Sequence, residues 1–385
     1  MISALFLLPE GEDMKNTLIA SVNADQVDDK KLKPFAKMLR EGKTVAFPTE
    51  TVYGLGADAM NPEAVKAIFR AKGRPSDNPL IVHVADRKDL EALVEEVTPM
   101  AEKLAKAFWP GPLTIILKKK PSVPESVTAG LDTVAVRIPS HPIAHRLIAM
   151  AGVPVAAPSA NLSGKPSPTR GSHVIKDLDG RVDGIIDGGM AMVGLESTVV
   201  DATGDSPVIL RPGGITKEQV LAAMELPERS GRTETSPVLS LKEEKTPRSP
   251  GMKYAHYAPD APMLVVKASE VDMVEAIKRE ADRCRLEGKR VGILCTEETL
   301  IKGWPLLWKD GNPEVERVMP EGGRLVLLGS LKKPETIAAR LFDALRSFDD
   351  TDVTVILAEA ISEKSLGHAI MNRLLKASGS MVIKG

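Results

Sequence analysis

The sequence has few residues that could cross-link the chain or hold a structural metal. Among 385 residues there are only two cysteines, Cys284 and Cys295, and they form no Cys-x-x-Cys pair and no Cys/His spacing. A zinc site is not expected, because structural zinc sites need four such ligands in short, paired spacings. So low a cysteine count fits a reducing cytoplasm better than an oxidising compartment.

Long apolar runs and an excess of one charge are also missing. The apolar start at residues 2–8 follows no basic segment and stops at Pro9. It is too short for a signal peptide, or for the roughly 20 residues of a membrane span. The 51 Lys and Arg residues nearly balance the 52 Asp and Glu residues. A protein that mainly coats nucleic acid would carry a clear basic excess, although a local basic pocket is compatible with this balance.

Residues 28–226 alternate between helical and strand patterns, which predicts an α/β domain. Asn61, Pro62 and Glu63 form a strong helix start, with Asn61 as N-cap, and this helix ends near Gly73. Because many strands are short and interrupted by Pro or Gly, we do not expect a regular doubly wound sheet. Other helices are expected at 30–41, 141–150 and 216–224, and strands at 44–47, 79–84, 113–117, 133–138, 153–157, 182–187, 197–201 and 208–210.

The segments outside this domain differ in composition. Residues 1–27 are expected to be an N-terminal extension and lead-in, and residues 227–260 form a linker rich in charged residues and proline. The end of this linker contains His256 together with Tyr254 and Tyr257, which are two of the three tyrosines in the chain. A passive linker rarely concentrates aromatic residues, so this end is a candidate functional segment.

Residues 261–385 predict a second, smaller α/β domain. Its strand–helix repeats indicate a parallel, Rossmann-like sheet. Strands are expected at 263–266, 290–295, 324–328 and 353–358, and helices at 270–287, 333–347 and 367–377.

Residues 54–59 (GLGADA) nearly match a dinucleotide fingerprint. In a Rossmann site the glycines lie in the turn directly after a strand, whereas residues 48–53 intervene here. A tight turn before the helix at Pro62 is therefore the main interpretation, and dinucleotide binding is the minor one. The sequence contains no Gly-x-x-x-x-Gly-Lys-Ser/Thr motif, which excludes a P-loop ATPase by motif.

Two groups of cations are candidates for ligand binding. Lys72 and Arg74 flank a glycine in a proline-stiffened loop. Such cations often only complement the end of a helix, but a rigid loop also suits a polyphosphate. Arg137 interrupts an apolar strand, where it either pairs with a nearby acid or holds a substrate carboxylate with two bonds. Spacing alone leaves both readings open.

Two further loops have a functional and a plain interpretation. Residues 157–167 are rich in small and hydroxyl residues, whose amides and hydroxyls can hold phosphates without a P-loop. The plain alternative is a Ser/Pro loop. Arg211 ends a strand before a glycine pair and follows the segment 196–201. It is either a ligand-binding arginine or a surface arginine in a turn.

Taken together and in order, these segments resemble the threonylcarbamoyl-AMP synthase family. The end of the linker, 249–257 (SPGMKYAHY), and the second domain resemble the longer, two-domain form of that family. The similarity runs from about residue 28 to the end of the sequence. In the first domain it rests on 48–56 (PTETVYGLG), 72–75 (KGRP), 78–80 (NPL), 137–139 (RIP), 158–161 (PSAN), 163–164 (SG), 196–198 (EST) and 211–213 (RPG).

The resemblance implies a fold and a reaction. The first domain would be a YrdC-like, twisted, open α/β domain with a concave basic face. The enzyme would be a nucleotidyltransferase that joins L-threonine to bicarbonate or CO2 and then to AMP from ATP, releasing pyrophosphate. A threonylcarbamoyl transferase would use the product to modify position 37 of ANN-decoding tRNAs. Mg2+ would arrive on ATP, with no metal site of the protein's own.

The resemblance also assigns residues to the two substrates. Lys72, Arg74 and Arg211 would serve catalysis, and Tyr254 would cover ATP as part of a lid that excludes water. The ATP-binding residues would be Lys72, Arg74, Asn78, Thr133, Ser159, Ser167, Arg211 and Tyr254. The threonine-binding residues would be Thr51, His83, Arg137, Ala157 through its backbone, and Ser197.

Two alternatives belong to other functional classes. A binding module could hold double-stranded RNA or tRNA on the basic face without chemistry, but the near-neutral net charge counts against it. Salt-dependent RNA affinity without nucleotide turnover would favour that module. A hydrogenase-maturation carbamoyltransferase uses a related domain, but it carries extra acylphosphatase-like and zinc-finger segments. The absence of any Cys-x-x-Cys pair argues against it.

Overall fold

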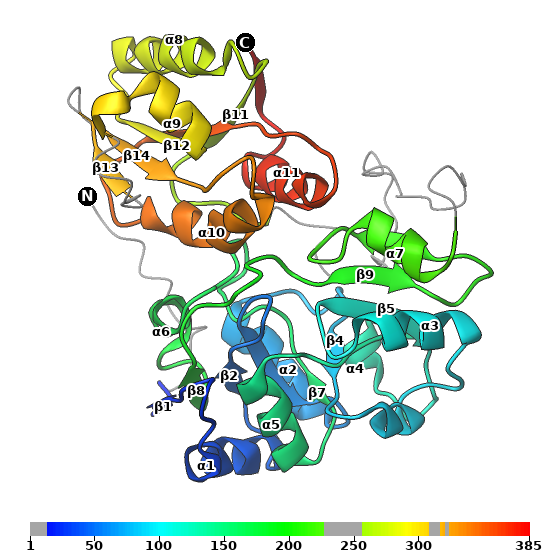
Figure 1. Cartoon of the computed structure of the whole chain (residues 1–385). Helices are drawn as coiled ribbons and strands as arrows, with labels where there is room; N and C mark the ends of the chain where they lie inside the picture. Colours follow the sequence, from blue (N-terminus) through cyan, green and yellow to red (C-terminus); the bar gives the residue numbers. More distant parts are fainter. Residues whose placement is uncertain (1–13, 227–255, 308–315, 320–322) are drawn as a thin grey trace.

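The computed structural model describes residues 14–226, 256–307, 316–319 and 323–385. These residues form two α/β units, each built on its own sheet, with the second unit stacked on the first (Figure 1). No helix of the described residues is long and apolar enough to cross a membrane.

The first sheet of the described chain has ten strands in the order β1-β8-β2-β3-β7-β4-β6-β5-β9-β10. Parallel and antiparallel neighbours are mixed: β4 pairs with β6 in parallel, for example, whereas β5 pairs with β6 antiparallel. The expectation that this sheet is not a regular doubly wound one is therefore confirmed. The strands are β1 Leu18–Ser21, β2 Val45–Phe47, β3 Gly54–Asp58, β4 Ile81–His83, β5 Leu113–Lys118, β6 Thr133–Arg137, β7 Val155–Ala156, β8 Gly184–Asp187, β9 Thr198–Asp201 and β10 Val208–Arg211.

The predicted helix after Asn61 forms for the expected reasons. The Asn61 side chain accepts hydrogen bonds from the backbone N–H groups of Glu63 and Ala64, and Pro62 occupies the first turn. The helix stops at Gly73, whose φ of 58° is left-handed. The helices of this unit are α1 Asp29–Arg40, α2 Pro62–Lys72, α3 Pro99–Phe108, α4 Glu125–Thr128, α5 Pro142–Ala151, α6 Gly171–Leu178 and α7 Lys217–Ala223, with a 3-10 helix at Arg87–Ala92.

The tight turn predicted at residues 54–59 is wrong, because residues 54–58 form strand β3. Its glycines serve close packing within the sheet rather than a turn. A Cβ atom on Gly56 would lie 2.6 Å from both the Phe47 ring and a Val155 methyl group. The sequence analysis did not predict α6 or β1, which lies in the expected lead-in and pairs in parallel with β8. It also missed α3, although Thr98 caps this helix and Pro99 stands in its first turn, as Asn61 and Pro62 do for α2.

The second sheet of the described residues has six strands in the order β13-β14-β12-β15-β11-β16, and only β13 is antiparallel to its neighbour. This confirms the predicted Rossmann-like arrangement. Helices α8 and α9 pack on one face, and α10 and α11 pack on the other. The strands are β11 Met263–Lys267, β12 Val291–Cys295, β13 Glu316–Val318, β14 Arg324–Leu327, β15 Val355–Glu359 and β16 Val382–Lys384. The helices are α8 Met273–Leu286, α9 Glu297–Gly303, α10 Pro334–Ser347 and α11 Leu366–Ala377, with a 3-10 helix at Pro305–Leu307.

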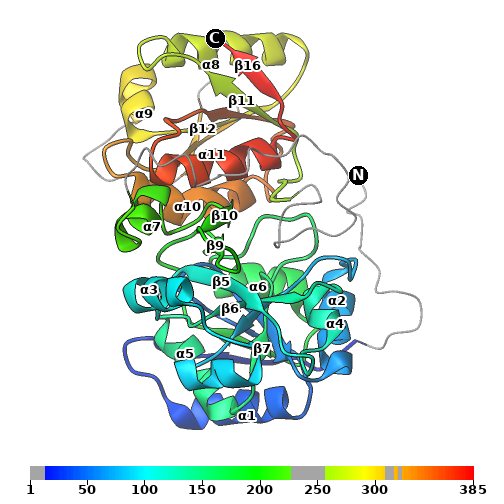
Figure 2. The same ribbon diagram turned by 90° about the vertical axis from the view of Figure 1, so that its right-hand side faces the viewer.

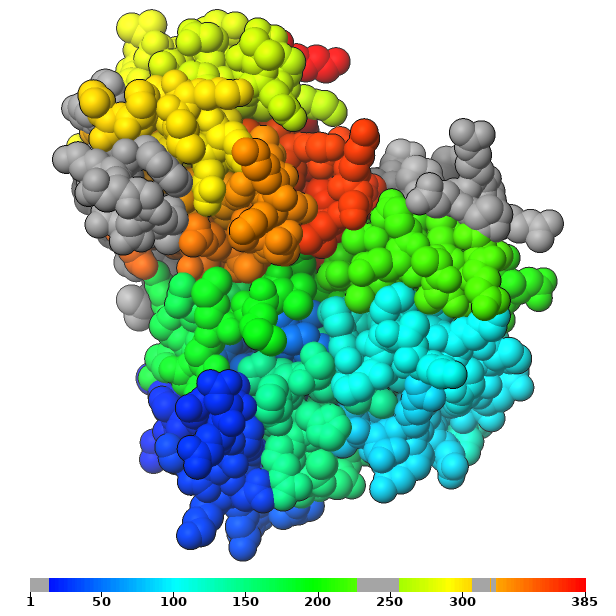
Figure 3. Space-filling view, viewed as in Figure 1, coloured from blue at the N-terminus to red at the C-terminus, as the bar shows by residue number. Residues whose placement is uncertain are grey.

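Helices α10 and α11 form the side of the second unit that meets the first (Figure 2). In the space-filling view the orange and red atoms of this side rest on the green atoms of the first unit (Figure 3). Val52, Leu195 and Tyr257 belong to the same buried apolar cluster as residues of α10 and α11. Gly194 brings its backbone against α10, since a Cβ atom there would lie 2.4 Å from the carbonyl oxygen of Ala338.

The close approach at Gly194 predicts that Gly194→Ala loosens the contact between the two units. The added methyl group would meet the α10 backbone, and overpacking of this kind costs about 1–3 kcal/mol. Alanine would also be strained at the φ of 73°. The measurement is the free energy of unfolding in urea. Gly189→Ala is the matched control, because Gly189 has a φ of 85° but open space around its Cβ position. Equal losses in the two variants would contradict the packing argument.

Candidate active site

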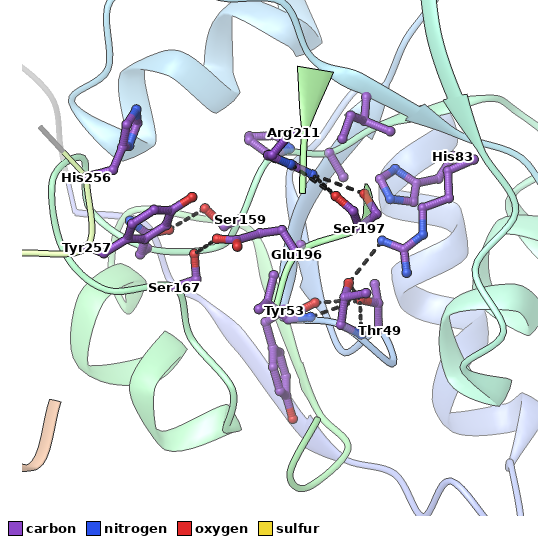
Figure 4. Close-up of a pocket in the computed structure, with 18 of the residues that line it drawn as sticks. Thr49, Tyr53, His83, Ser159, Ser167, Glu196, Ser197, Arg211, His256 and Tyr257 are labelled. Atoms are coloured by element: carbon purple, nitrogen blue, oxygen red, sulfur yellow. Dashed lines mark hydrogen bonds between the residues drawn. The ribbon is translucent and has the colours of Figure 1, made fainter. Parts of the chain in front are cut away.

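A cavity lies where the ends of several strands of the first sheet meet the start of the second unit (Figure 4). Strands β4 and β6 run in parallel with His83 opposite Arg137, so both side chains reach the same edge of the sheet. Strand β10 returns beside β9 and brings Arg211 next to Ser197.

The structure brings most of the predicted site residues to this cavity. Its lining includes Thr51, Arg74, His83, Arg137, Ala157, Ser159, Ser167, Ser197 and Arg211. Lys72, Asn78 and Thr133 are not among the lining residues. Tyr254 lies outside the described residues, and so does the part of the predicted lid before His256.

Lys72 lies behind the cavity wall. Its ammonium group donates hydrogen bonds to the backbone carbonyls of Ser159, at 2.5 Å, and Asn161, at 2.6 Å. Burial and then the nearby charge of Arg74 hold the pKa of Lys72 well below its usual value. In this arrangement Lys72 supports the loop that follows β7.

Asn78 and Thr133 do not line the cavity. Asn78 is fully buried, and neither its side-chain oxygen nor its nitrogen has a hydrogen-bond partner among the described residues. Thr133 begins β6, whereas Arg137 ends it, and Thr133 lines a separate depression with Asp132 and Asp201.

Arg137 is held by three neighbours. Its Nε atom donates to the carbonyl of Gly111 at 3.1 Å, and its Nη1 atom donates to Thr51 Oγ1 at 2.9 Å. Its Nη2 atom lies 2.8 Å from Glu50 Oε1 in a buried ion pair. Burial would raise the pKa of Glu50, but the charge of Arg137 lowers it overall. The reading that Arg137 pairs with a nearby acid is therefore correct, and its place in the cavity wall leaves the carboxylate-binding reading open.

His83 in the cavity wall is held in its neutral form. Burial and then the charge of Arg137 lower its pKa to about 3. Its Nδ1 atom is buried and has no hydrogen-bond partner among the described residues. A neutral imidazole of such low basicity can accept a hydrogen bond from a ligand, but it is a weak proton acceptor at neutral pH.

Arg211 and Ser197 form a second polar cluster, shown by the dashed lines in Figure 4. The guanidinium of Arg211 donates to the Ser197 carbonyl at 3.0 and 3.1 Å, and to Ser197 Oγ at 3.0 Å. The Ser197 hydroxyl also lies 2.8 Å from the hydroxyl of Thr114. Burial lowers the pKa of Arg211 to about 10, so it keeps its charge at neutral pH.

Sequence reasoning gave no role to Glu196, His256 and Tyr257, which all line the cavity. Burial and then the charge of Lys376 lower the pKa of His256 to about 4. The ring of Tyr257 packs against Phe342 of α10, with 5.0 Å between the ring centroids. The aromatic end of the linker was the signal that could have found His256 and Tyr257, and the motif at 196–198 was the signal for Glu196.

The wall as a whole favours an anionic ligand. Arg74, Arg137, Lys165 and Arg211 line it, and the carboxylate of Glu196 is paired with Arg373 at 3.0 Å. Two of these cations also have carboxylate partners, since Arg137 pairs with Glu50 and Lys165 pairs with Asp260 and Asp349. Arginine forks match carboxylates and phosphates, particularly where water is excluded. Within the described residues there is no group of three or more His, Cys, Asp or Glu that could hold a metal ion.

Comparison with known proteins gives close relatives over nearly the whole sequence. A family model described as "Telomere recombination" matches residues 37–213, and one described as "Threonylcarbamoyl-AMP synthase, C-terminal domain" matches residues 215–379. A threonylcarbamoyl-AMP synthase of Bacillus subtilis is 50% identical, with 93% of this chain and 95% of the relative aligned. One from Pyrococcus abyssi is 46% identical, with 96% and 99% aligned.

A solved structure agrees with these relatives. The crystal structure of P. abyssi Sua5 complexed with L-threonine superposes with a TM-score of 0.85 at 46% identity. The superposition covers 96% of this chain and 100% of that one.

The buried, neutral state of His83 predicts that stability falls as pH drops below 6.5. The ordinary pKa of 6.5 applies in the unfolded chain and about 3 in the folded one. The unfolded chain therefore binds more protons in this window, and the free energy of unfolding falls by up to about 1.4 kcal/mol per pH unit. Urea unfolding between pH 7.5 and 5 measures the slope.

A variant comparison isolates the contribution of His83. His83→Asn is expected to make the pH slope shallower, because it removes the group that must remain neutral. His145→Asn is the control, because His145 lies on α5 outside the cavity and is only half-buried. An unchanged slope in folded His83→Asn would contradict the prediction.

Proposed function

The chain belongs to the threonylcarbamoyl-AMP synthase family, and we propose that it makes L-threonylcarbamoyladenylate from L-threonine, bicarbonate or CO2, and ATP, releasing pyrophosphate. The observation that carries the proposal is the cavity itself. It brings together Arg137, which can bind a carboxylate, and the neutral His83 from distant parts of the sequence, with further cations beside them. The threonine found with the P. abyssi relative supports the choice of amino acid.

L-Threonine is proposed to bind at the edge formed by β4 and β6. Arg137 would hold the carboxylate, because its Nη2 atom makes an ion pair with Glu50 but no hydrogen bond with good geometry. Thr51, Ser197 and the Ala157 backbone would surround the amino acid. The neutral Nδ1 atom of His83 would accept a hydrogen from the amine or hydroxyl group.

ATP is proposed to bind along the cationic part of the wall. Arg74 and Arg211 would balance the charge of the phosphates. The hydroxyls of Ser159 and Ser167 donate to Asn161 and Glu196, so toward the nucleotide they would accept hydrogen bonds from its hydroxyl or amino groups. Lys72 would act indirectly, through the hydrogen bond that its ammonium group donates to the backbone carbonyl of Ser159. Asn78 and Thr133 do not line the cavity in this arrangement. Tyr254 stays a proposed cover for ATP.

The reaction depends on orienting the substrates and excluding water more than on a nucleophile from the protein. The neutral amine of threonine attacks CO2, a C–N bond forms, and one C–O bond pair moves onto oxygen to give a carbamate. The proton lost from the nitrogen passes to water. A carbamate oxygen then attacks the α-phosphorus of ATP, the bond from this phosphorus to the bridging oxygen breaks, and pyrophosphate leaves. Fixed cations stabilise charge on the leaving group, and a closed cavity protects the unstable carbamate from water.

The remaining assignments also follow from the family. ATP would enter with Mg2+ on its phosphates, so the metal is part of the substrate. The product would pass to a transferase that modifies tRNA. We propose a cytoplasmic location, which the two unpaired cysteines support.

Pyrophosphate release from ATP and bicarbonate is expected to depend on L-threonine. L-Serine should give a rate at least about tenfold lower, because it lacks the methyl group that a fitted pocket can recognise. The measurement is a coupled pyrophosphate assay with purified protein. If folded protein binds ATP but shows no threonine dependence, the synthase proposal fails. Salt-dependent RNA binding without turnover would then support the RNA-binding module.

Arg137→Lys is expected to raise the KM for L-threonine at least about tenfold and to change the KM for ATP much less. Lysine keeps the charge but cannot hold a carboxylate with two parallel bonds. Steady-state kinetics with each substrate varied in turn measures the split. Arg146→Lys is the control, because Arg146 pairs with Asp29 on the exposed surface. A larger effect on ATP than on threonine would contradict the assignment of Arg137.

A further inference from the structure

The second unit reaches the cavity wall through a fully buried arginine. Arg373 lies on α11 and is 0% exposed, although it does not line the cavity itself. Its Nε and Nη2 atoms both donate to Glu196 Oε2 at 3.0 Å, and its Nη1 atom donates to the carbonyl of Pro212 at 2.5 Å. One guanidinium group therefore ties together two loops of the first unit.

Both loops carry proposed substrate-binding residues. Glu196 directly precedes Ser197, and Pro212 directly follows Arg211. Glu196 also accepts a hydrogen bond from the Ser167 hydroxyl at 2.6 Å, drawn in Figure 4. A shift of Arg373 would thus be passed to Ser167 and Arg211 on the ATP side, whereas Ser197 is also held by the hydroxyl of Thr114.

The charge of Arg373 matters as much as its reach. Burial would raise the pKa of Glu196, but Arg373 and then Arg211 lower it to about 2, so the carboxylate stays ionised. An ionised carboxylate only accepts hydrogen bonds, so Ser167 must donate its proton to Glu196 and present its lone pairs to the cavity. Without Arg373, the negative charge of Glu196 would be compensated less and would repel the phosphates of ATP more strongly.

A second arginine from the same side supports one of these loops. Arg346 of α10 donates to the carbonyl of Pro166 at 2.6 and 3.1 Å and pairs with Asp177 at 2.7 Å. Pro166 directly precedes Ser167. Stability alone is a weak explanation for such buried pairs, because the cost of desolvating two charges offsets much of their attraction. Their placement against the cavity loops indicates a role in shaping the site.

We propose that Arg373 is a positioning residue for the ATP side of the cavity. It acts through Glu196 and the backbone of Pro212, and it fixes Ser167 and Arg211 while neutralising the carboxylate between them. The second unit thereby completes the site that the first unit presents. This inference rests on the proposed function, since it assigns ATP to this part of the wall.

The test compares Arg373→Gln and Arg373→Lys with the full-length wild type. For Arg373→Gln we expect the KM for ATP and the Kd for ATP from calorimetry to rise at least tenfold. The KM for L-threonine should change less than threefold. Arg373→Lys keeps the charge but loses the contact with both loops. Its KM and Kd for ATP should therefore lie between those of Arg373→Gln and the wild type. Lys176→Gln is the control, because it breaks only the exposed pair between Lys176 and Asp350 across the same contact.

The double variant Arg373→Gln/Glu196→Gln separates charge from folding. It removes both charges together, and it should bind ATP more tightly than Arg373→Gln alone. If Arg373→Gln does not fold, Arg373→Lys and the double variant decide. ATP binding as tight as in wild type, in a folded variant, overturns the proposal. So does a loss that is equal for ATP and threonine.

The failure of this inference can be distinguished from failure of the proposed function. A wild-type protein that shows no threonine-dependent pyrophosphate release removes the proposed reaction. Wild-type turnover with unchanged ATP affinity in the Arg373 variants removes only the role of Arg373.

Discussion

The structure depends on the pairing of charges that have been taken out of water. A buried guanidinium or ammonium group costs several kcal/mol unless oxygen atoms surround it. Arg137 meets Glu50, Thr51 and the Gly111 carbonyl, and Arg211 meets the carbonyl and hydroxyl of Ser197. Because each cation needs fixed oxygen partners, the loops that supply those oxygens are fixed as well.

This constraint links the two units. Arg373 and Arg346 come from the helices of the second unit, and their partners are oxygens of the first unit beside the cavity. Tyr257 adds an apolar contact at the same place, since its ring packs against Phe342 of α10. Of the described residues after position 226, His256 and Tyr257 at the end of the linker line the cavity. Helices α10 and α11 of the second unit nevertheless determine how several lining residues are held.

Much of the fold could be predicted from local signals. Asn61, Pro62 and Gly73 set the ends of α2, and alternation of apolar segments placed most strands and both α/β units. The signal at Gly54 and Gly56 was misread, because a glycine that allows close packing within a sheet looks the same in sequence as a glycine in a turn. Helix α6 and the short edge strand β1 are defined by what they pack against, so no local pattern identified them.

The sequence by itself determined the residue types, their order and the family motifs, and therefore the chemistry that the chain can offer. It did not determine which of those residues share a space. Only the tertiary structure brought Glu196, His256 and Tyr257 into the cavity, placed Lys72 behind its wall and put Thr133 at the far end of β6. The physical reason is that strand register and the contact between the two units act over long sequence separations. A buried charge finds its partner there, as Arg373 finds Glu196, with no local signal of the pairing.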